Sequence, residues 1–165
     1  MAGHRAVGIG IAAFSALAAS VAFAQPQRLL GGQAGGQWSG EYTCSQGLTG
    51  MTVELRPQRG DVVDATVIFF EHPRNPGVAS GCYGARGVID RATGRLELRP
   101  TRWIVKPGEG WSMTTLDGRL SADGGYSGRV IFAGEPAACA NFTLRRNARP
   151  FKAAPAACVT EAPMS

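Results

Sequence analysis

The chain has 165 residues and a formal net charge of +5, and 44% of its residues are hydrophobic while 18% are charged. This balance is typical of a folded protein and excludes an intrinsically disordered one. The 23 glycines and 10 prolines exclude a helical bundle and favour short strands joined by turns. One domain accounts for this length, because compact domains most often hold roughly 100–150 residues.

The first 24 residues have the three parts of an export signal. A basic start precedes an apolar run over residues 6–19, and small residues follow at Ala22 and Ala24, where a signal peptidase needs them. We predict a signal peptide over 1–24 that is cleaved after Ala24. The apolar run is shorter than the about 20 residues of a membrane-spanning helix. We therefore expect a periplasmic or secreted protein with no membrane span in the mature chain.

The mature chain divides into three parts. Residues 25–37 are rich in glycine and are predicted to form a flexible lead-in. Residues 38–146 are predicted to form the folded domain, and residues 147–165 an Ala- and Pro-rich tail. Cys158 lies in that tail, so a disulfide there would attach the tail to the domain.

Turn signals recur at fairly even intervals between Trp38 and Arg146. They are Gln46-Gly47 with Gly50, Pro57 to Gly60, Pro73 to Gly77, Asp90 to Gly94, Pro107 to Gly110, Asp123-Gly124-Gly125 and Gly134-Glu135-Pro136. Seven connections separate eight segments, each about as long as a strand. Several of these segments alternate between apolar and polar residues, as half-buried strands do, and the examples are residues 51–56, 95–99 and 141–145.

The segment Ala65 to Phe70 is apolar on both faces, so we expect this strand to be covered on both sides. The short connections predict an antiparallel, all-β fold, because parallel strands need long crossovers. Eight such strands predict an up-and-down, calycin-like β-barrel, with a two-sheet β-sandwich as the alternative. We expect the barrel interior to be filled by large apolar side chains, namely Ile68, Phe69, Phe70, Phe132 and Phe142.

All four cysteines lie in the mature chain, and an even count in an exported chain predicts two disulfides. No two cysteines are close in sequence and the mature chain has one histidine, so a metal site is not expected. An up-and-down barrel brings the end of its first strand to the start of its eighth. This geometry predicts the pair Cys44–Cys139 and leaves Cys82–Cys158, although Cys139 has the parity of the polar face of its strand.

Without Arg5 the mature chain has 16 basic and 12 acidic side chains, a net charge of +4. In the cytosol such a balance would favour nucleic-acid binding. Outside the cytoplasm we expect no nucleic-acid partner. The anionic partners would be envelope phosphates, acidic glycans or an acidic protein surface, and the alternative is an ordinary solvated surface.

Three resemblances to known families follow from short motifs. The opening Trp38-Ser39-Gly40-Glu41-Tyr42-Thr43-Cys44, with Gln46-Gly47 and Thr49-Gly50, resembles a small all-β domain of exported bacterial proteins whose function is uncharacterised. That resemblance covers residues 38–146 and implies neither an activity nor site residues. Gly36-Gln37-Trp38 with Arg145-Arg146 is similar to calycin barrels, in which a first-strand Trp packs under an Arg at the barrel floor.

The third resemblance is to bacterial inhibitors of C-type lysozyme, which are small exported barrels. Tyr42-Thr43-Cys44 and Cys139 match the Tyr-x-Cys and the late Cys of these inhibitors, and residues 80–83 are similar to their inhibitory loop. Cys82 inside this loop departs from the inhibitor pattern, which puts the transfer of inhibitory residues in doubt.

Catalysis needs titratable groups that converge, and the sequence offers few. His72 is the one mature histidine, and it enters a Pro-rich turn. A hydrolase would have to use it as general base, with Asp61 or Asp64 and Ser80 nearby, but no nucleophile motif supports this arrangement. We predict no catalytic residue, no cofactor and no metal.

Two regions are candidates for binding. The loop from Pro73 to Tyr83 is the longest connection, and long loops on rigid scaffolds often bind partners. Trp103 and Trp111 flank a turn and are expected at one barrel rim, where they would form a sugar-stacking or protein-contact surface, or would close the barrel end over the core. The candidate binding residues are His72, Arg74, Asn75, Tyr83, Arg102, Trp103, Lys106 and Trp111.

Together these patterns predict an exported, monomeric, non-catalytic β-barrel that binds an unidentified ligand or protein of the bacterial cell envelope. The first alternative is an inhibitor of a lysozyme- or protease-type hydrolase. The second alternative is a small hydrolase that uses His72.

Overall fold

The computed structural model describes residues 34–133, residues 136–148 and Cys158. The predicted signal peptide and most of the predicted lead-in and tail lie outside the described residues. Within these residues there is no helix with the length and apolar character needed to cross a bilayer.

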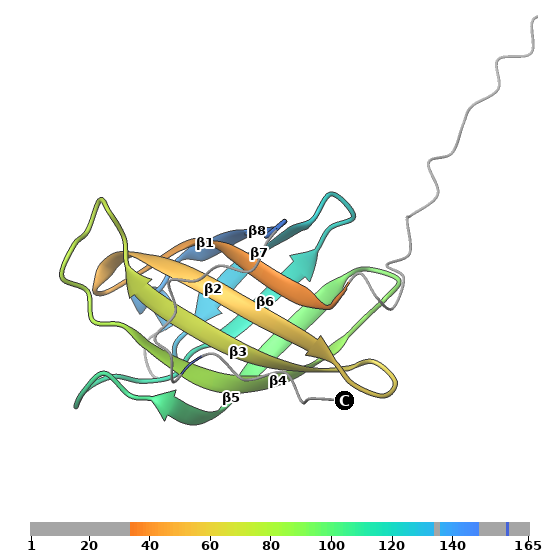
Figure 1. Cartoon of the computed structure of the whole chain (residues 1–165), viewed down its shortest axis with the longest axis horizontal. Helices are drawn as coiled ribbons and strands as arrows, with labels where there is room; N and C mark the ends of the chain where they lie inside the picture. The colour runs from red at the N-terminus through yellow and green to blue at the C-terminus, as the bar shows by residue number, and fades with distance from the viewer. Residues whose placement is uncertain (1–33, 134–135, 149–157, 159–165) are drawn as a thin grey trace, which may run out of the picture.

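Eight antiparallel strands close into a barrel (Figure 1). The strands are β1 (Gly36–Cys44), β2 (Gly47–Pro57), β3 (Val62–Glu71), β4 (Gly81–Ile89), β5 (Arg95–Val105), β6 (Thr115–Leu120), β7 (Gly125–Ile131) and β8 (Asn141–Arg146), with a short 3-10 helix, η2 (Pro136–Ala138), before β8. Each strand pairs with the next, and β8 returns to pair with β1. The predicted all-β barrel is confirmed, and the sandwich alternative is wrong.

Each of the seven predicted connections lies at a junction between two of these strands, although Gly47 and Pro57 belong to β2 and Gly125 to β7. Gly50, which we expected in the first turn, lies instead inside β2. It is a position of close approach, because a Cβ on Gly50 would clash with the ring of Phe70 on β3. The first strand begins at Gly36, and Ala34 before it is already buried.

The inward-facing side chains of the strands form the core. They include Val53 and Leu55 of β2, Leu96 and Leu98 of β5, and Leu144 of β8, all at most 2% exposed. The alternation of apolar and polar residues in the sequence predicts this face because successive side chains of a strand point to opposite sides.

Trp38 is fully buried at one end of the barrel, which we call the floor. The guanidinium of Arg146 lies 5.3 Å from the centre of the Trp38 ring, in cation–π geometry. Arg146 also donates a hydrogen bond of 2.6 Å to the carbonyl oxygen of Gly35. This end is therefore closed by an indole with an arginine over it.

Part of the predicted interior is wrong. Phe69 and Phe142 point into the core, but Ile68 and Phe70 lie on the outer face of the barrel. The physical reason is strand alternation, since Val67 and Phe69 occupy the inner face of β3. Ile68 is buried there beside Cys82 and Cys158, so β3 is covered on both faces, as expected.

Both predicted disulfides are present. Cys44 is bonded to Cys139, with 3.9 Å between their Cα atoms, and Cys82 is bonded to Cys158, with 5.9 Å. Cys139 precedes β8, which starts at Asn141, so the parity of that strand does not apply to it. Two disulfides indicate an oxidising compartment outside the cytoplasm.

The barrel opens between β5 and β6. These strands pair only along the first four residues of β5, from Arg95 to Leu98. Pro100 follows shortly after, and a proline has no N–H to donate to a neighbouring strand. Beyond it, the pairing of β5 with β4 has two register shifts, between Cys82 and Tyr83 and between Gly84 and Ala85. The second half of β5 thus stays paired with β4 but not with β6, and the connection to β6 occupies the space beside it.

Candidate functional site

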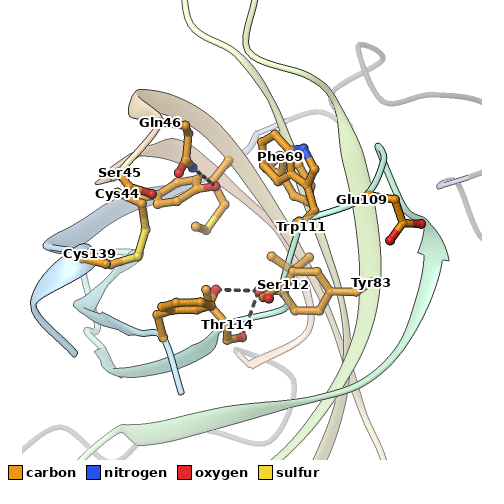
Figure 2. Close-up of a pocket in the computed structure, with 16 residues that line it drawn as sticks. Cys44, Ser45, Gln46, Phe69, Tyr83, Glu109, Trp111, Ser112, Thr114 and Cys139 are labelled. Carbon is orange, nitrogen blue, oxygen red and sulfur yellow. Dashed lines mark hydrogen bonds between the residues drawn. A yellow bond between two sulfur atoms is a disulfide. The ribbon is translucent and has the colours of Figure 1, made fainter. Parts of the chain in front are cut away.

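A cavity of about 310 Å³ lies at the barrel end opposite Trp38, which we call the mouth (Figure 2). The turn after β1, the connection from β5 to β6 and the connection from β7 to β8 surround it. Its lining residues are Tyr42, Cys44, Ser45, Gln46, Met51, Val67, Phe69, Tyr83, Glu109, Gly110, Trp111, Ser112, Thr114, Phe132, Ala138 and Cys139.

The inner part of the cavity is apolar. Met51 of β2 with Val67 and Phe69 of β3 are all at most 4% exposed. The indole of Trp111 stacks on Phe69, with 5.2 Å between ring centres and 14° between planes. Figure 2 shows these two rings side by side on one wall. Offset stacking of two aromatic rings is a favourable contact. The stack therefore holds the β5–β6 connection, which carries Trp111, over the mouth.

Two tyrosine hydroxyls are among the polar groups of the lining. Gln46 donates a hydrogen bond of 3.0 Å from Nε2 to the hydroxyl of Tyr42 and one of 3.3 Å to Oγ1 of Thr49. The hydroxyl of Tyr83 donates to the carbonyl oxygen of Thr114 over 3.0 Å and also lies 3.0 Å from the Oγ1 of that residue. The tyrosines thereby attach two connections of the mouth to the barrel wall.

Burial raises the pKa of both hydroxyls. The pKa of Tyr83 rises to about 12 because the low-dielectric interior disfavours the charged form, although its bonds to Thr114 partly oppose this. The pKa of Tyr42 also lies above its ordinary value, chiefly for the same reason. Both groups are therefore neutral hydrogen-bonding groups at physiological pH.

Glu109 is the one lining residue with a formal charge among those that the structure describes. Its side chain is fully exposed and lies 3.7 Å from the Nζ of Lys106. Figure 2 shows its carboxylate turned away from the cavity. The interior of the cavity thus has no charged side chain from the described part of the chain.

The Cys44–Cys139 disulfide forms the wall opposite the aromatic pair (Figure 2). Next to it, the amide of Ala140 donates a hydrogen bond of 2.8 Å to the carbonyl oxygen of Thr43. These links hold the β7–β8 connection against the end of β1, so this wall is covalently fixed.

Four of the predicted binding residues lie at or near the mouth. Tyr83 and Trp111 line the cavity. Lys106 does not line it, but its ammonium group lies next to the carboxylate of Glu109, which does. Trp103 packs behind the lining, edge-on to Phe69 at 6.2 Å and to Tyr83 at 5.7 Å. Both indoles thus contact the core while one of them also faces the cavity.

The other predicted residues lie elsewhere. His72, Arg74 and Asn75 form a corner beside the turn after β1, in the connection from β3 to β4, which projects beyond the strands (Figure 1). Asn75 donates hydrogen bonds from Nδ2 to the carbonyl oxygens of Gln46 (2.9 Å) and Leu48 (3.0 Å). Its role is structural, since it fixes this projecting turn to the β1–β2 turn.

His72 has partners on both ring nitrogens. Its Nε2 lies 3.2 Å from Oε2 of Glu41, and its Nδ1 accepts a hydrogen bond of 3.1 Å from the amide of Arg74. The guanidinium of Arg74 contacts the same carboxylate at 3.3 Å.

Arg102 lies neither at the mouth nor in the β3–β4 connection but on the outer wall of the barrel.

Sequence reasoning missed several lining residues, above all Tyr42, Gln46 and Thr114. Tyr42 could have been found, since it shares the inward parity of Trp38 along the first strand. Gln46 and Thr114 give no such signal, because polar residues are common in turns and their partners come from other strands.

Within the residues that the structure describes, no three His, Cys, Asp or Glu side chains are grouped so as to hold a metal ion. At the mouth, the described residues offer a shaped cavity, aromatic rings and neutral hydrogen-bonding groups.

Comparisons with protein-family models and with curated proteins found no match to this chain.

Proposed function

We propose that this chain is an exported, non-catalytic binding module of the cell envelope that takes a small, neutral, partly apolar molecule into the barrel mouth. The observation that carries the proposal is the cavity of about 310 Å³ with an apolar inner part and two neutral phenols. Ligand sites commonly have volumes of about 300–1,000 Å³ and combine apolar walls with a few polar groups. The cavity lies at the lower limit of that range.

The lining favours a neutral ligand. An ion moved from water into an apolar cavity loses hydration free energy unless an opposite charge compensates it. The only formal charge of the described lining, on Glu109, is exposed and faces Lys106. A ligand without charge loses less on entry, and the rings of Phe69 and Trp111 offer it a flat apolar wall.

The hydrogen-bonding groups of the lining favour a ligand with an acceptor group. The Tyr42 hydroxyl accepts a hydrogen bond from Gln46 and also interacts with the side chain of Thr49. A tyrosine hydroxyl can donate and accept at once. A carbonyl, ether or hydroxyl oxygen of the ligand would accept the proton of Tyr42 in place of Thr49.

The hydrolase alternative has less support. A general base needs a free nitrogen within reach of the proton that it removes. Both nitrogens of His72 are engaged, by Glu41 and by the amide of Arg74, and His72 is not among the residues that line the cavity. We therefore expect His72→Ala to leave ligand binding unchanged.

A matched pair of serine variants tests the proposal. N-phenyl-1-naphthylamine, a neutral fluorescent probe, is titrated into the purified mature protein and then displaced by neutral candidate ligands. Ser112→Trp places an indole at the cavity, and we expect it to weaken probe binding by at least about tenfold, because filling the site removes the contact area. Ser127→Trp adds the same side chain at an exposed position of β7, and this variant should bind the probe as the unchanged protein does.

Equal probe binding by both variants, or none by the unchanged protein, would contradict a ligand site at the mouth.

The second candidate function is inhibition of a hydrolase. It is favoured by the projecting turn, where Arg74 is 69% exposed in its side chain while Asn75 fixes the backbone. Inhibition of a lysozyme or protease by a protein that binds no probe would favour this candidate.

A further inference from the structure

A second hollow, of about 400 Å³, lies on the outer wall of the barrel. It crosses β2 to β5, and its lining includes Arg56 of β2, Asp64 of β3, Gly84 and Arg86 of β4, and Arg102 and Ile104 of β5. We call this hollow the wall groove. It shares no lining residue with the cavity at the mouth.

The irregular pairing of β5 with β4 forms the wall groove. The two register shifts set six residues of β5, from Pro100 to Val105, against four of β4, from Cys82 to Ala85. Such bulges bend a strand and redirect its side chains. At the centre lies Gly84, where an added Cβ would come 3.0 Å from Oγ1 of Thr101. The missing side chain of Gly84 keeps the groove open.

Three arginines from three strands line the wall groove, and two of them are held in place. Arg86 of β4 binds both carboxylate oxygens of Asp64, through Nε at 2.6 Å and Nη2 at 3.3 Å. Arg56 of β2 donates a hydrogen bond of 3.0 Å from Nη2 to Oγ1 of the buried Thr66. Its Nη1 lies 3.2 Å from the carboxylate of Glu54.

Arg102 of β5 differs from the other two. It is exposed, and no described residue forms a hydrogen bond or an ion pair with its guanidinium. Arg86 is paired with Asp64 and Arg56 with Glu54, so the unpaired Arg102 gives the groove an excess of positive charge. Arg102 is the group that an incoming anion would meet first.

We propose that the wall groove binds the phosphate group of a phosphate ester. Guanidinium groups bind phosphate oxygens through paired, charge-assisted hydrogen bonds. The guanidinium groups of the lining come from β2, β4 and β5, and the Thr101 hydroxyl adds a further donor, so the groove offers several donors to the several oxygens of a phosphate. Ile104, which is 38% exposed, offers an apolar edge for the organic part of the ester. This site is independent of the ligand proposed for the mouth.

The phosphate ester has two possible sources outside the cytoplasm, a lipid headgroup or a phosphorylated glycan. Amide chemical shifts of the mature protein are followed by NMR while glycerol 3-phosphate is added at low salt. We expect shifts around Gly84 and Thr101 that saturate and that weaken as salt is added, because salt screens exposed charges. A parallel sedimentation assay uses vesicles of phosphatidylglycerol and of phosphatidylcholine.

Three variants identify the groove. Arg102→Ala should weaken glycerol 3-phosphate binding by at least about tenfold, since a charge-assisted hydrogen bond is lost. Arg102→Lys should restore part of it. Arg129→Ala removes an exposed arginine from β7 and so makes the same change in net charge; its affinity should stay within about twofold, because its charge is distant from the groove.

Because Arg102 has no partner in the described structure, Arg102→Ala should keep the unfolding midpoint of the unchanged protein. Binding of glycerol 3-phosphate together with phosphatidylglycerol vesicles supports a lipid source, and binding of glycerol 3-phosphate alone supports a glycan source. The proposal is overturned if glycerol 3-phosphate causes no saturable shifts, or if Arg129→Ala weakens binding as much as Arg102→Ala.

Discussion

Single polar residues in or beside the connections act mainly by fixing those connections to the barrel or to one another. Asn75 is the clearest example, because one amide group donates to two carbonyl oxygens of the β1–β2 turn. Tyr83 does the same for Thr114 of the β5–β6 connection. A residue that binds a ligand cannot be distinguished in the sequence from a residue that fixes a loop, since both are polar side chains in or next to turns.

Asn75→Ala should therefore reduce stability, although the Asn75 side chain itself does not line the cavity. Two partly buried carbonyl oxygens lose their donor, and each such bond contributes about 0.5–1.5 kcal/mol. We expect the free energy of unfolding to fall by about 1–3 kcal/mol in chemical denaturation. Arg74→Ala, one residue away and exposed, should change it by less than about 0.5 kcal/mol. An equal effect of both variants would mean that Asn75 does not fix this turn.

At the scale of elements, the two disulfides have different tasks. Cys44–Cys139 joins the end of β1 to the connection before β8 and forms a wall of the cavity. Cys82–Cys158 lies on the outer face, where Ile68 is buried beside it. The sequence separations are 95 and 76 residues, so the two bonds constrain the unfolded chain to a similar extent.

Removing each disulfide with paired Cys→Ala substitutions should separate stability from binding. Closing loops of this length stabilises the fold by about 4–5 kcal/mol in the chain-entropy model, so both variants should be less stable by a similar amount. Only the variant without Cys44–Cys139 should also lose affinity for a neutral probe at the mouth, because its wall is no longer fixed. Equal affinities of the two variants in native buffer would contradict this assignment.

The strands were predictable from the sequence because their signals are local. Turn residues and alternating faces depend on near neighbours, and both are visible in the chain around Leu96 and Phe142. The mouth was less predictable because it depends on where β5 stops pairing with β6. Pro100 is visible in the sequence, but the two shifts in the pairing of β5 with β4 depend on which strands are adjacent. Arg102, one of the predicted binding residues, lies on the outer wall, in the part of β5 that has these shifts.

At the scale of the whole molecule, the barrel is closed at the floor and open at the mouth. Trp38 and Arg146 close the floor, whereas the separation of β5 from β6 opens the mouth. The part of β5 that is not paired with β6 carries Pro100 and the arginines Arg99 and Arg102, and its pairing with β4 on the other side has two register shifts. Proline, bulges and charge are the features that prevent edge strands from pairing with other chains. The same features that protect the edge also shape the wall groove.

All three tyrosines of the chain, Tyr42, Tyr83 and Tyr126, are buried. Burial is the main cause that raises the pKa of each of them, to about 12 for Tyr83. In the unfolded chain each tyrosine has a pKa of about 10. A folded-state pKa above the unfolded value adds stability that is fully present below pH of about 10 and is lost as the pH rises toward the folded-state pKa.

We therefore expect the barrel to lose stability steeply above pH of about 10, because unfolding then releases up to three protons. Tyrosinate absorbance and near-ultraviolet circular dichroism, measured after rapid pH jumps, should change together in one transition. Tyr126→Phe removes one titrating group and a buried hydrogen bond of 3.2 Å to the carbonyl oxygen of Leu96. It should lower stability at neutral pH and make the alkaline decline shallower. Tyrosinate absorbance that appears near the ordinary pKa while the dichroism stays native would show that the tyrosines reach solvent in the folded barrel, contrary to their burial.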